Sequence, residues 1–204
     1  KGADPVNRKQ EELGTHILEN VRNELYYYFP YLDGAFACIS GKGSEETRTI
    51  GTDGEFFLFS PEYLLELYVK KPEAVRRGYL HMLLHCLYLH PFSDHAGEFL
   101  WDTACDLTVE RIIEGLDLPR LGKKPPILPE LGKQPLTAQQ IYGYLRESAP
   151  DFDGSPYAFD DHSSWKDAPG KTSRRKWEAL LLAAAGDKTG AGKRGHTAGA
   201  GLED

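Results

Sequence analysis

Apolar residues near the start of the chain recur at every fourth position, which is the period of one face of an α-helix. This run begins shortly after Asp4-Pro5, a typical helix start, and it ends before Pro30. The pattern therefore predicts one amphipathic helix that stops ahead of Pro30. Its apolar face consists of Leu13, Ile17, Val21 and Leu25.

Three short stretches that follow have the composition of β-strands: residues 36–40, 47–50 and 55–59. Two turns rich in glycine, at 41–44 and 51–54, separate them. Short strands joined by such turns are typical of hairpins. The sequence predicts a small antiparallel meander of three strands.

The helical period then returns, and residues that favour helix starts stand ahead of it at Pro61, Pro72 and Thr137. A segment with five prolines, residues 119–136, predicts extended chain. We therefore expect an α+β fold in which a small antiparallel sheet packs beside several helices. The expected helices cover residues 61–70, 73–90, 98–115, 138–147 and about 174–185.

The composition changes at Gly186. Residues 186–204 contain six glycines and a single large apolar residue, Leu202. Such a segment buries too little surface to offset its ordering entropy. We expect one domain over residues 1–185, followed by a Gly-rich linker or disordered tail over 186–204.

Charge and cysteine content exclude several classes of protein. The formal net charge is -7 and the pI is near 5.5, whereas nucleic acids and anionic membranes require a concentrated basic face. Cys38, Cys86 and Cys105 are odd in number and form no CxxC pair, which favours a reducing compartment. We expect a cytoplasmic protein with neither a nucleic-acid nor a membrane partner.

Two histidines in the central helix are candidates for metal binding. His81 and His85 are four residues apart, so they project from one helix face and can bind one Zn²⁺. His90 lies about 180° further round an ideal helix and is not expected to join them. The simpler interpretation is that both imidazoles are hydrogen-bonded within the core.

The next helix supplies a carboxylate. Asp102 and Asp106 share one face with Val109 and Ile113. The charge of Asp102 suits the start of a helix, but Asp106 lies one turn deeper. Opposite two histidines, Asp106 would complete a His₂Asp set and leave a fourth position open.

An ordered set of motifs runs from the strands to these two helices. It includes Gly51-Thr52-Asp53-Gly54, Ser60-Pro61, the histidine helix and the pattern Trp101-x-x-Ala104-x-Asp106. This set resembles the metallopeptidase-like domain that precedes a von Willebrand factor A-like domain in bacterial proteins. The resemblance covers about residues 10–185, including the Asp161-His162-x-x-Trp165 stretch.

The resemblance implies a zincin-like fold with a HExxH helix under a small sheet, and Zn²⁺ as the cofactor. His81 and His85 match the two histidine ligands, and Asp106 matches the downstream acidic ligand. The catalytic glutamate of the family corresponds to Met82. A thioether cannot act as a general base, so no catalytic residue is assigned and Met82 only occupies that position.

These features lead to one main expectation about function and two alternatives. The main expectation is a zinc-binding, metallopeptidase-like domain that is impaired or inactive in peptide hydrolysis and binds a peptide or protein segment. A C-terminal von Willebrand factor A-like domain is a further candidate partner. The alternatives are an active peptidase whose base comes from elsewhere, such as Glu98 or Asp94, and a structural module without metal.

Other polar residues receive simpler interpretations. His95 is expected to be solvated, and Cys86 and Cys105 are expected to be small buried thiols. His162 is expected to be a loop histidine bonded to its own turn, in preference to forming a second polar cluster with Asp161.

Overall fold

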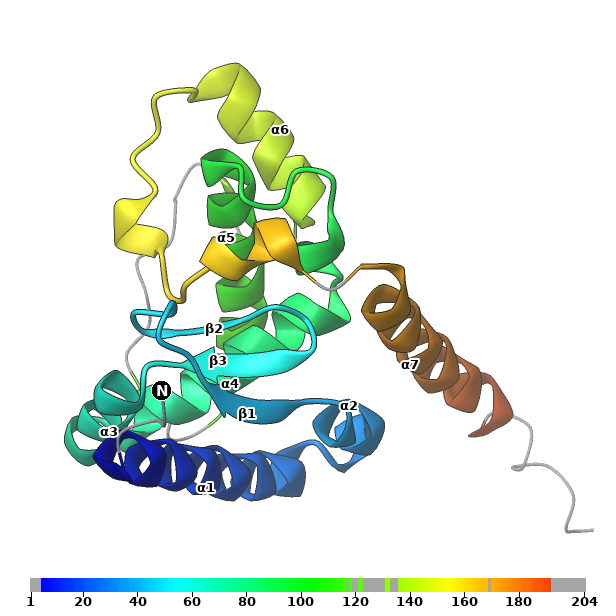
Figure 1. Ribbon diagram of the computed structural model, residues 1–204. Coiled ribbons are helices and arrows are strands. Elements are labelled where there is room, and N and C mark those ends of the chain that lie inside the picture. Colours follow the sequence, from blue (N-terminus) through cyan, green and yellow to red (C-terminus); the bar gives the residue numbers. More distant parts are fainter. Residues whose placement is uncertain are drawn as a thin grey trace, which may run out of the picture.

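The computed structural model describes residues 5–116, 118, 121–122, 131–132, 136–168 and 170–191. Within these residues, seven α-helices surround a three-stranded sheet (Figure 1). The predicted α+β class is therefore confirmed. Most of the proline-rich segment 119–136 lies outside the described residues.

The first helix, α1 (Pro5–Tyr28), ends before Pro30 as predicted. Ile17, Val21 and Leu25 are buried in the core. A short 3₁₀ turn, η1 (Pro30–Leu32), and a five-residue helix, α2 (Asp33–Ala37), follow. The expected first strand at 36–40 is wrong, since α2 takes up its first residues.

The sheet is mixed, whereas an antiparallel sheet was expected. Its strands are β1 (Ser40–Gly43), β2 (Ile50–Thr52) and β3 (Phe56–Phe59), in the order β1-β3-β2. β2 and β3 form the expected antiparallel pair. β1 pairs with β3 in parallel, because the chain crosses from one edge of the sheet to the other between β1 and β2.

A glycine explains why the position of β1 was mispredicted. Gly41 was assigned to a turn, yet it lies within β1 opposite Phe57. A β-carbon at Gly41 would lie 2.8 Å from Cδ1 of Leu18 on α1. The glycine thus permits the close approach of α1 to the strand, a role that glycine also takes in strands.

Helices α3, α4, α5 and α6 begin within one residue of their predicted starts, whereas α7 begins three residues earlier than predicted and α4 ends three residues earlier. Ser60 caps α3, and Thr137 with Gln140 forms a capping box at α6. Among the described residues, no helix has the length and apolar character needed to cross a bilayer. The elements are α3 (Pro61–Lys70), α4 (Pro72–Leu87), η2 (His90–Phe92), α5 (Phe99–Gly115), α6 (Ala138–Ser148), η4 (Ser155–Tyr157), η5 (Ser163–Asp167) and α7 (Lys171–Ala191).

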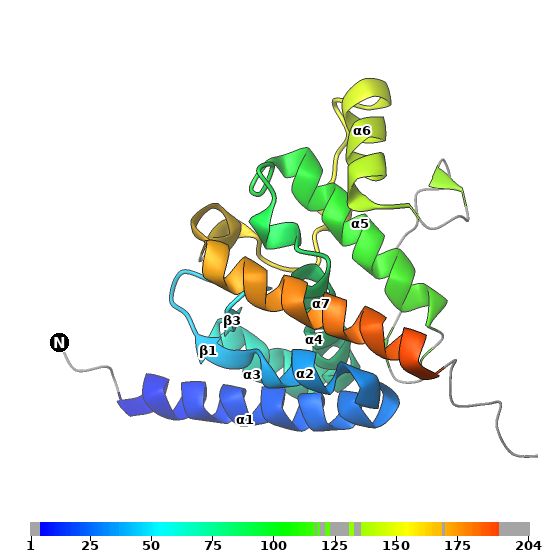
Figure 2. The same cartoon turned by 90° about the vertical axis from the view of Figure 1, so that its right-hand side faces the viewer.

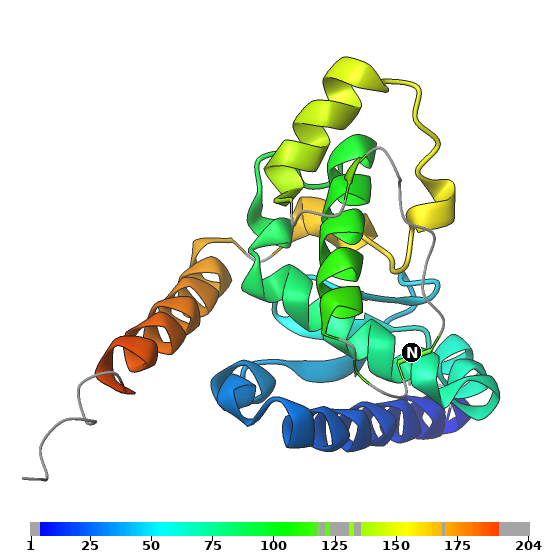
Figure 3. The same cartoon turned by 180° about the vertical axis from the view of Figure 1, so that it is seen from behind.

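Helix α4 lies at the centre of the molecule. It packs on the sheet and α1 on one side and on α5 on another, and α6 covers the far side of α5 (Figure 3). The main apolar core surrounds α4 and includes Phe57, Phe59 and Leu83. A second core lies between α5 and α6 around Trp101 and Ile141.

Helix α7 packs along α2 and α4 (Figure 2). Trp177 is fully buried, and its indole N–H donates a hydrogen bond to the carbonyl of Gly54 (2.8 Å). Helical backbone continues to Ala191, past the expected domain boundary at residue 185. Residues 192–204 of the expected tail lie outside the described residues.

Candidate metal centre

Helix α4 places two imidazoles side by side on a buried face. His81 and His85 are 1% and 0% exposed, and their Nε2 atoms lie 2.7 Å apart. Every residue from Tyr79 to Cys86 is buried, because the helix is covered by the sheet and by α5. Polar groups at such depth require partners.

Helix α5 brings Asp106 across from this pair. Its Oδ1 atom lies 3.2 Å from Nε2 of both His81 and His85. Asp102, one turn earlier, serves the start of the helix, where its Oδ1 accepts a hydrogen bond from the amide of Gly97 (3.0 Å). The three residues selected from the sequence as metal ligands therefore lie together.

A fourth donor, Asp160, comes from a loop that the sequence analysis did not select. Its Oδ1 atom lies 3.3 Å from Nε2 of His81 and 3.8 Å from Nε2 of His85. The side chain is 1% exposed, and neither carboxylate oxygen has a hydrogen-bond partner among the described residues. Donor atoms of His81, His85, Asp106 and Asp160 lie within 4.8 Å of one another, and this group could hold a metal ion.

Backbone pairing holds this loop against the free edge of β2. Asp161 forms a parallel bridge with Gly51, and its amide donates to the carbonyl of Ile50 (2.7 Å). Alternate residues of an extended segment share a face, so Asp160 and His162 both reach the same cluster. The sequence offers two weak signals for this pair: the alternation, which is too common to select it, and the Asp161-His162-x-x-Trp165 stretch of the family resemblance.

His162 contacts Asp160 of its own loop and also reaches Asp106 on α5, which the sequence analysis did not predict. Its Nε2 atom lies 2.7 Å from Oδ1 of Asp160 and 3.2 Å from Oδ1 of Asp106. The ring stacks on Trp165 with 3.7 Å between ring centroids. Pairing of the loop with β2 carries the histidine to this position.

Further residues orient the histidine His81. Nδ1 of His81 lies 2.7 Å from Oε1 of Glu110, and Nε of Arg77 donates to the other oxygen of that carboxylate (2.8 Å). A carboxylate can only accept, so Nδ1 of His81 carries a proton and Nε2 is the nitrogen that would bind an ion beside Asp106 and Asp160. Carboxylates behind ligand histidines perform this role in metal sites.

His90 contacts His85 on the side away from the metal-site donors, although the sequence analysis did not expect His90 to reach this pair. Helix α4 ends at Leu87, and Leu89 adopts a left-handed backbone conformation with φ of 61°. This reversal brings Nδ1 of His90 to 2.8 Å from Nδ1 of His85. A bulky residue in this conformation is strained, so surrounding contacts must stabilise the turn that positions His90.

The charges of the cluster are strongly coupled. Burial lowers the pKa of His81, but the carboxylates of Asp106, Asp160 and Glu110 outweigh burial and raise this pKa well above its usual value. The same balance, dominated by Asp160 and Asp106, raises the pKa of His162. Burial and the neighbouring His81 lower the pKa of His85 to about 4.

The charge balance of the group fits a divalent cation. Burial favours neutral Asp106 and Asp160, yet interactions with His162 and the other histidines hold both pKa values below their usual range. Two buried carboxylates thus require two positive charges. Protons on His81 and His162 supply them without a metal, and one divalent ion would supply the same charge.

The spacing of the donors also fits an ion. Donors placed ~2.0–2.2 Å from one ion at angles of ~90–120° lie about 2.8–3.8 Å from each other. The separations given above run from 2.7 to 3.8 Å. All the donors are nitrogen or carboxylate oxygen, which suits zinc and related divalent metals.

A cleft of about 270 Å³ opens onto this cluster. Asp106, Asp160 and His162 face it, and so does Asp102. Burial raises the pKa of Asp102 to about 6. The complete lining is Gly97, Phe99, Asp102, Thr103, Asp106, Gly154, Ala158, Asp160, His162, Ser163 and Lys166.

Met82 is 1% exposed and belongs to the main apolar core. It is not among the residues that line the cleft. The side chain therefore packs against apolar neighbours, away from the face of the cluster that a molecule in the cleft could approach.

Other candidates from the sequence lie away from the cleft. His95 is partly exposed and lies 3.0 Å from Oε1 of Glu98. Neither these two residues nor Asp94 lines the cleft. Cys86 and Cys105 are buried thiols, as expected, and neither belongs to the donor group.

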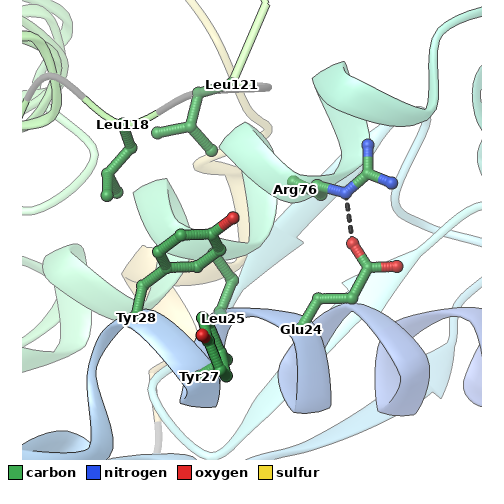
Figure 4. A pocket seen from close by; sticks show the side chains of 7 residues that line it. All are labelled: Glu24, Leu25, Tyr27, Tyr28, Arg76, Leu118 and Leu121. Atoms are coloured by element: carbon green, nitrogen blue, oxygen red, sulfur yellow. Dashed lines mark hydrogen bonds and ion pairs between the residues drawn. The ribbon is translucent and has the colours of Figure 1, made fainter.

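A second hollow, of about 340 Å³, lies between the end of α1 and the start of α4 (Figure 4). Arg76 and Glu24 form an ion pair at one side of it. None of the four metal-site donors reaches this hollow. Its lining is Glu24, Leu25, Tyr27, Tyr28, Arg76, Leu118 and Leu121.

Comparison with known proteins gives no relative from which a function could be transferred. No protein-family model, curated protein or solved structure matches the chain.

Proposed function

We propose that the protein is a metallopeptidase-like domain that binds one divalent metal ion through His81, His85, Asp106 and Asp160. The observation that carries this proposal is Asp160. A fully buried carboxylate without a hydrogen bond costs several kcal/mol unless a cation lies beside it, and either protonated histidines or a metal ion can be that cation. Two imidazoles and a second carboxylate surround it, which is the donor set that a metal requires.

Zinc is the proposed metal. Histidine and carboxylate are its common ligands outside thiolate sites, and the donor group contains no thiolate. Bound zinc would supply Lewis-acid chemistry. The protein holds the donors in place. Glu110 contacts Nδ1 of His81, and His90 contacts Nδ1 of His85, so each orients the ring of a proposed ligand.

We propose that the domain binds a peptide or protein segment and cleaves it poorly or not at all. Hydrolysis requires a group that accepts a proton, and the position of the family's glutamate is occupied by Met82 within the apolar core. The cleft beside the cluster is the proposed binding place, and a C-terminal von Willebrand factor A-like domain is a second proposed partner. The absence of disulfides among Cys38, Cys86 and Cys105 supports a reducing compartment such as the cytoplasm.

One observation favours an active hydrolase as the second candidate. Asp102 lines the cleft, and burial raises its pKa to about 6, which suits a general base near neutral pH. In this alternative, Asp102 replaces the missing glutamate. Turnover of a peptide library by the zinc-loaded protein, abolished by Asp102→Asn while zinc is retained, would select this candidate.

Metal content tests the main proposal against a structural module without metal. We expect about one zinc per chain by elemental analysis, and far less in His85→Ala. His95→Ala is the matched control, because His95 is a histidine of the same region that pairs with Glu98 instead. Equal near-zero zinc in all three proteins would contradict the proposal.

A further inference from the structure

His162 differs from the two proposed histidine ligands in its position relative to the cleft. His81 and His85 lie on a helix that the core surrounds, and neither lines the cleft. His162 lies on the loop beside η5, and its side chain forms part of the cleft wall. It therefore lies in the same cleft wall as Asp106 and Asp160, on the cleft side of His81 and His85.

The ring of His162 is buried, and its Nε2 atom has no hydrogen-bond partner among the described residues. The side chain is 8% exposed. Although Nε2 lies 2.7 Å from Asp160 Oδ1 and 3.2 Å from Asp106 Oδ1, neither contact has the geometry of a hydrogen bond.

The ring is also fixed in this position from both sides. Trp165 stacks on one face with 22° between the ring planes. The backbone of Asp161 pairs with Gly51 on β2. A buried imidazole held in place by its own loop, with Nε2 2.7 and 3.2 Å from two donor oxygens, is arranged as metal ligands are.

We propose that His162 is a fifth protein ligand, which occupies the side of the metal that faces the cleft. This inference rests on the proposed metal site. It makes the donor set three imidazole nitrogens and two carboxylate oxygens. With His162 bound, three of the five proposed ligands line the cleft, namely Asp106, Asp160 and His162.

Cobalt(II) provides the test, because its visible spectrum reports the number of ligands. Five-coordinate Co²⁺ absorbs weakly, whereas four-coordinate Co²⁺ absorbs several times more strongly. We expect a weak band for the wild-type protein loaded with Co²⁺ and a clear change of the band in His162→Ala. Free imidazole, which fits the vacated space in the cleft, is expected to restore the wild-type spectrum.

The Co²⁺ experiment distinguishes the role of His162 from the existence of the metal site. His95→Ala should leave the spectrum unchanged, since His95 lies outside the cluster. A Co²⁺ spectrum that His162→Ala leaves unchanged overturns the inference but not the metal site. Wild-type protein that binds no Co²⁺ overturns both.

A second measurement needs no variant and therefore holds even if His162→Ala fails to fold. X-ray absorption at the zinc edge of the zinc-loaded wild-type protein counts coordinated imidazoles from their multiple scattering. Three imidazoles support His162 as a ligand. Two imidazoles overturn it.

Discussion

Oε1 of Glu110 lies 2.7 Å from Nδ1 of His81, while Nε2 of the same ring lies 3.2 Å from Asp106. The carboxylate on α5 thus fixes which nitrogen of His81 faces the metal-site donors. Arg77 in turn holds Glu110 from the opposite side. The orientation of a proposed ligand is therefore set by two residues that do not touch the metal position.

Replacing Glu110 by glutamine should weaken metal binding. Loss of such an orienting carboxylate typically lowers metal affinity by roughly 10–100-fold. Competition with a chelating dye measures the effect. Glu114→Gln is the matched control, because it removes the other carboxylate partner of Arg77 and leaves His81 untouched. Equal affinities for the two variants would argue against the role of Glu110.

Zinc binding should release protons near neutral pH. Because the pKa values of His81 and His162 are raised in the metal-free protein, both rings carry a proton there that the metal must displace. We expect up to about two protons per zinc and an affinity that falls as the pH is lowered. Calorimetry in two buffers of different ionisation enthalpy measures the release, and equal heats in both would refute it.

The same pKa shifts determine how the stability of the metal-free protein depends on pH. A raised pKa in the folded state means that the folded protein binds more protons than the unfolded chain. The contribution of His81 and His162 is therefore fully present below the unfolded pKa of ~6.5 and is lost as the pH rises through their raised values. Thermal melts above neutral pH should show that the rise in melting temperature caused by zinc becomes larger as the pH increases.

Met82→Glu should not restore peptidase activity. The side chain at position 82 packs in the apolar core and does not line the cleft, so a carboxylate there is buried away from any substrate. We expect a lower melting temperature, retained zinc and no cleavage of unstructured protein. Met82→Leu serves as the control for repacking. Cleavage that appears in Met82→Glu and disappears when His85→Ala is added would instead identify a silenced peptidase.

Local patterns were sufficient to predict the helices and part of the site. Prolines at helix starts and apolar residues at every fourth position predicted the positions of α1, α3 and α4. His81 and His85 share a face through helical periodicity alone. The prediction that Asp106 lies opposite these histidines required only that α5 pack against α4.

Tertiary contacts determine the rest, and they leave little trace in the sequence. Asp160 and His162 reach the cluster because their loop pairs with β2, which lies about 110 residues earlier (Asp161 minus Gly51). His90 reaches it because the chain reverses at Leu89. Strand β1 was mistaken for a turn because it contains Gly41 and Gly43. Only the packing of α1 against Gly41 shows that this segment is a strand.

Gly51→Ala should weaken metal binding even though Gly51 is not a ligand. A β-carbon at this position would lie 2.2 Å from the backbone oxygen of Asp161, a clash that forces the loop off β2. We expect lower zinc affinity and a lower melting temperature. Gly143→Ala is the control, since its β-carbon meets nothing within 4 Å. Unchanged zinc affinity in Gly51→Ala would show that the loop positions no ligand.

Cutting the chain after Ala185 should leave the melting temperature within error. The buried anchor of α7, Trp177, precedes the cut, whereas Leu182 is 74% exposed. By contrast, Trp177→Ala removes a fully buried ring and its hydrogen bond to Gly54. Such a change costs about 3–5 kcal/mol. Urea unfolding of both proteins tests this, and a large loss on truncation would contradict the expected boundary.

Asp161 gives the molecule a thermodynamic linkage between its interior and its surface. The two flanking residues reach the buried donor cluster, while Asp161 itself pairs with the edge of β2. Metal binding and this strand pairing are therefore coupled equilibria, and each strengthens the other by the same factor. A molecule that displaces the loop from β2 would lower the metal affinity by that factor, and removal of the metal would release the edge to such a molecule.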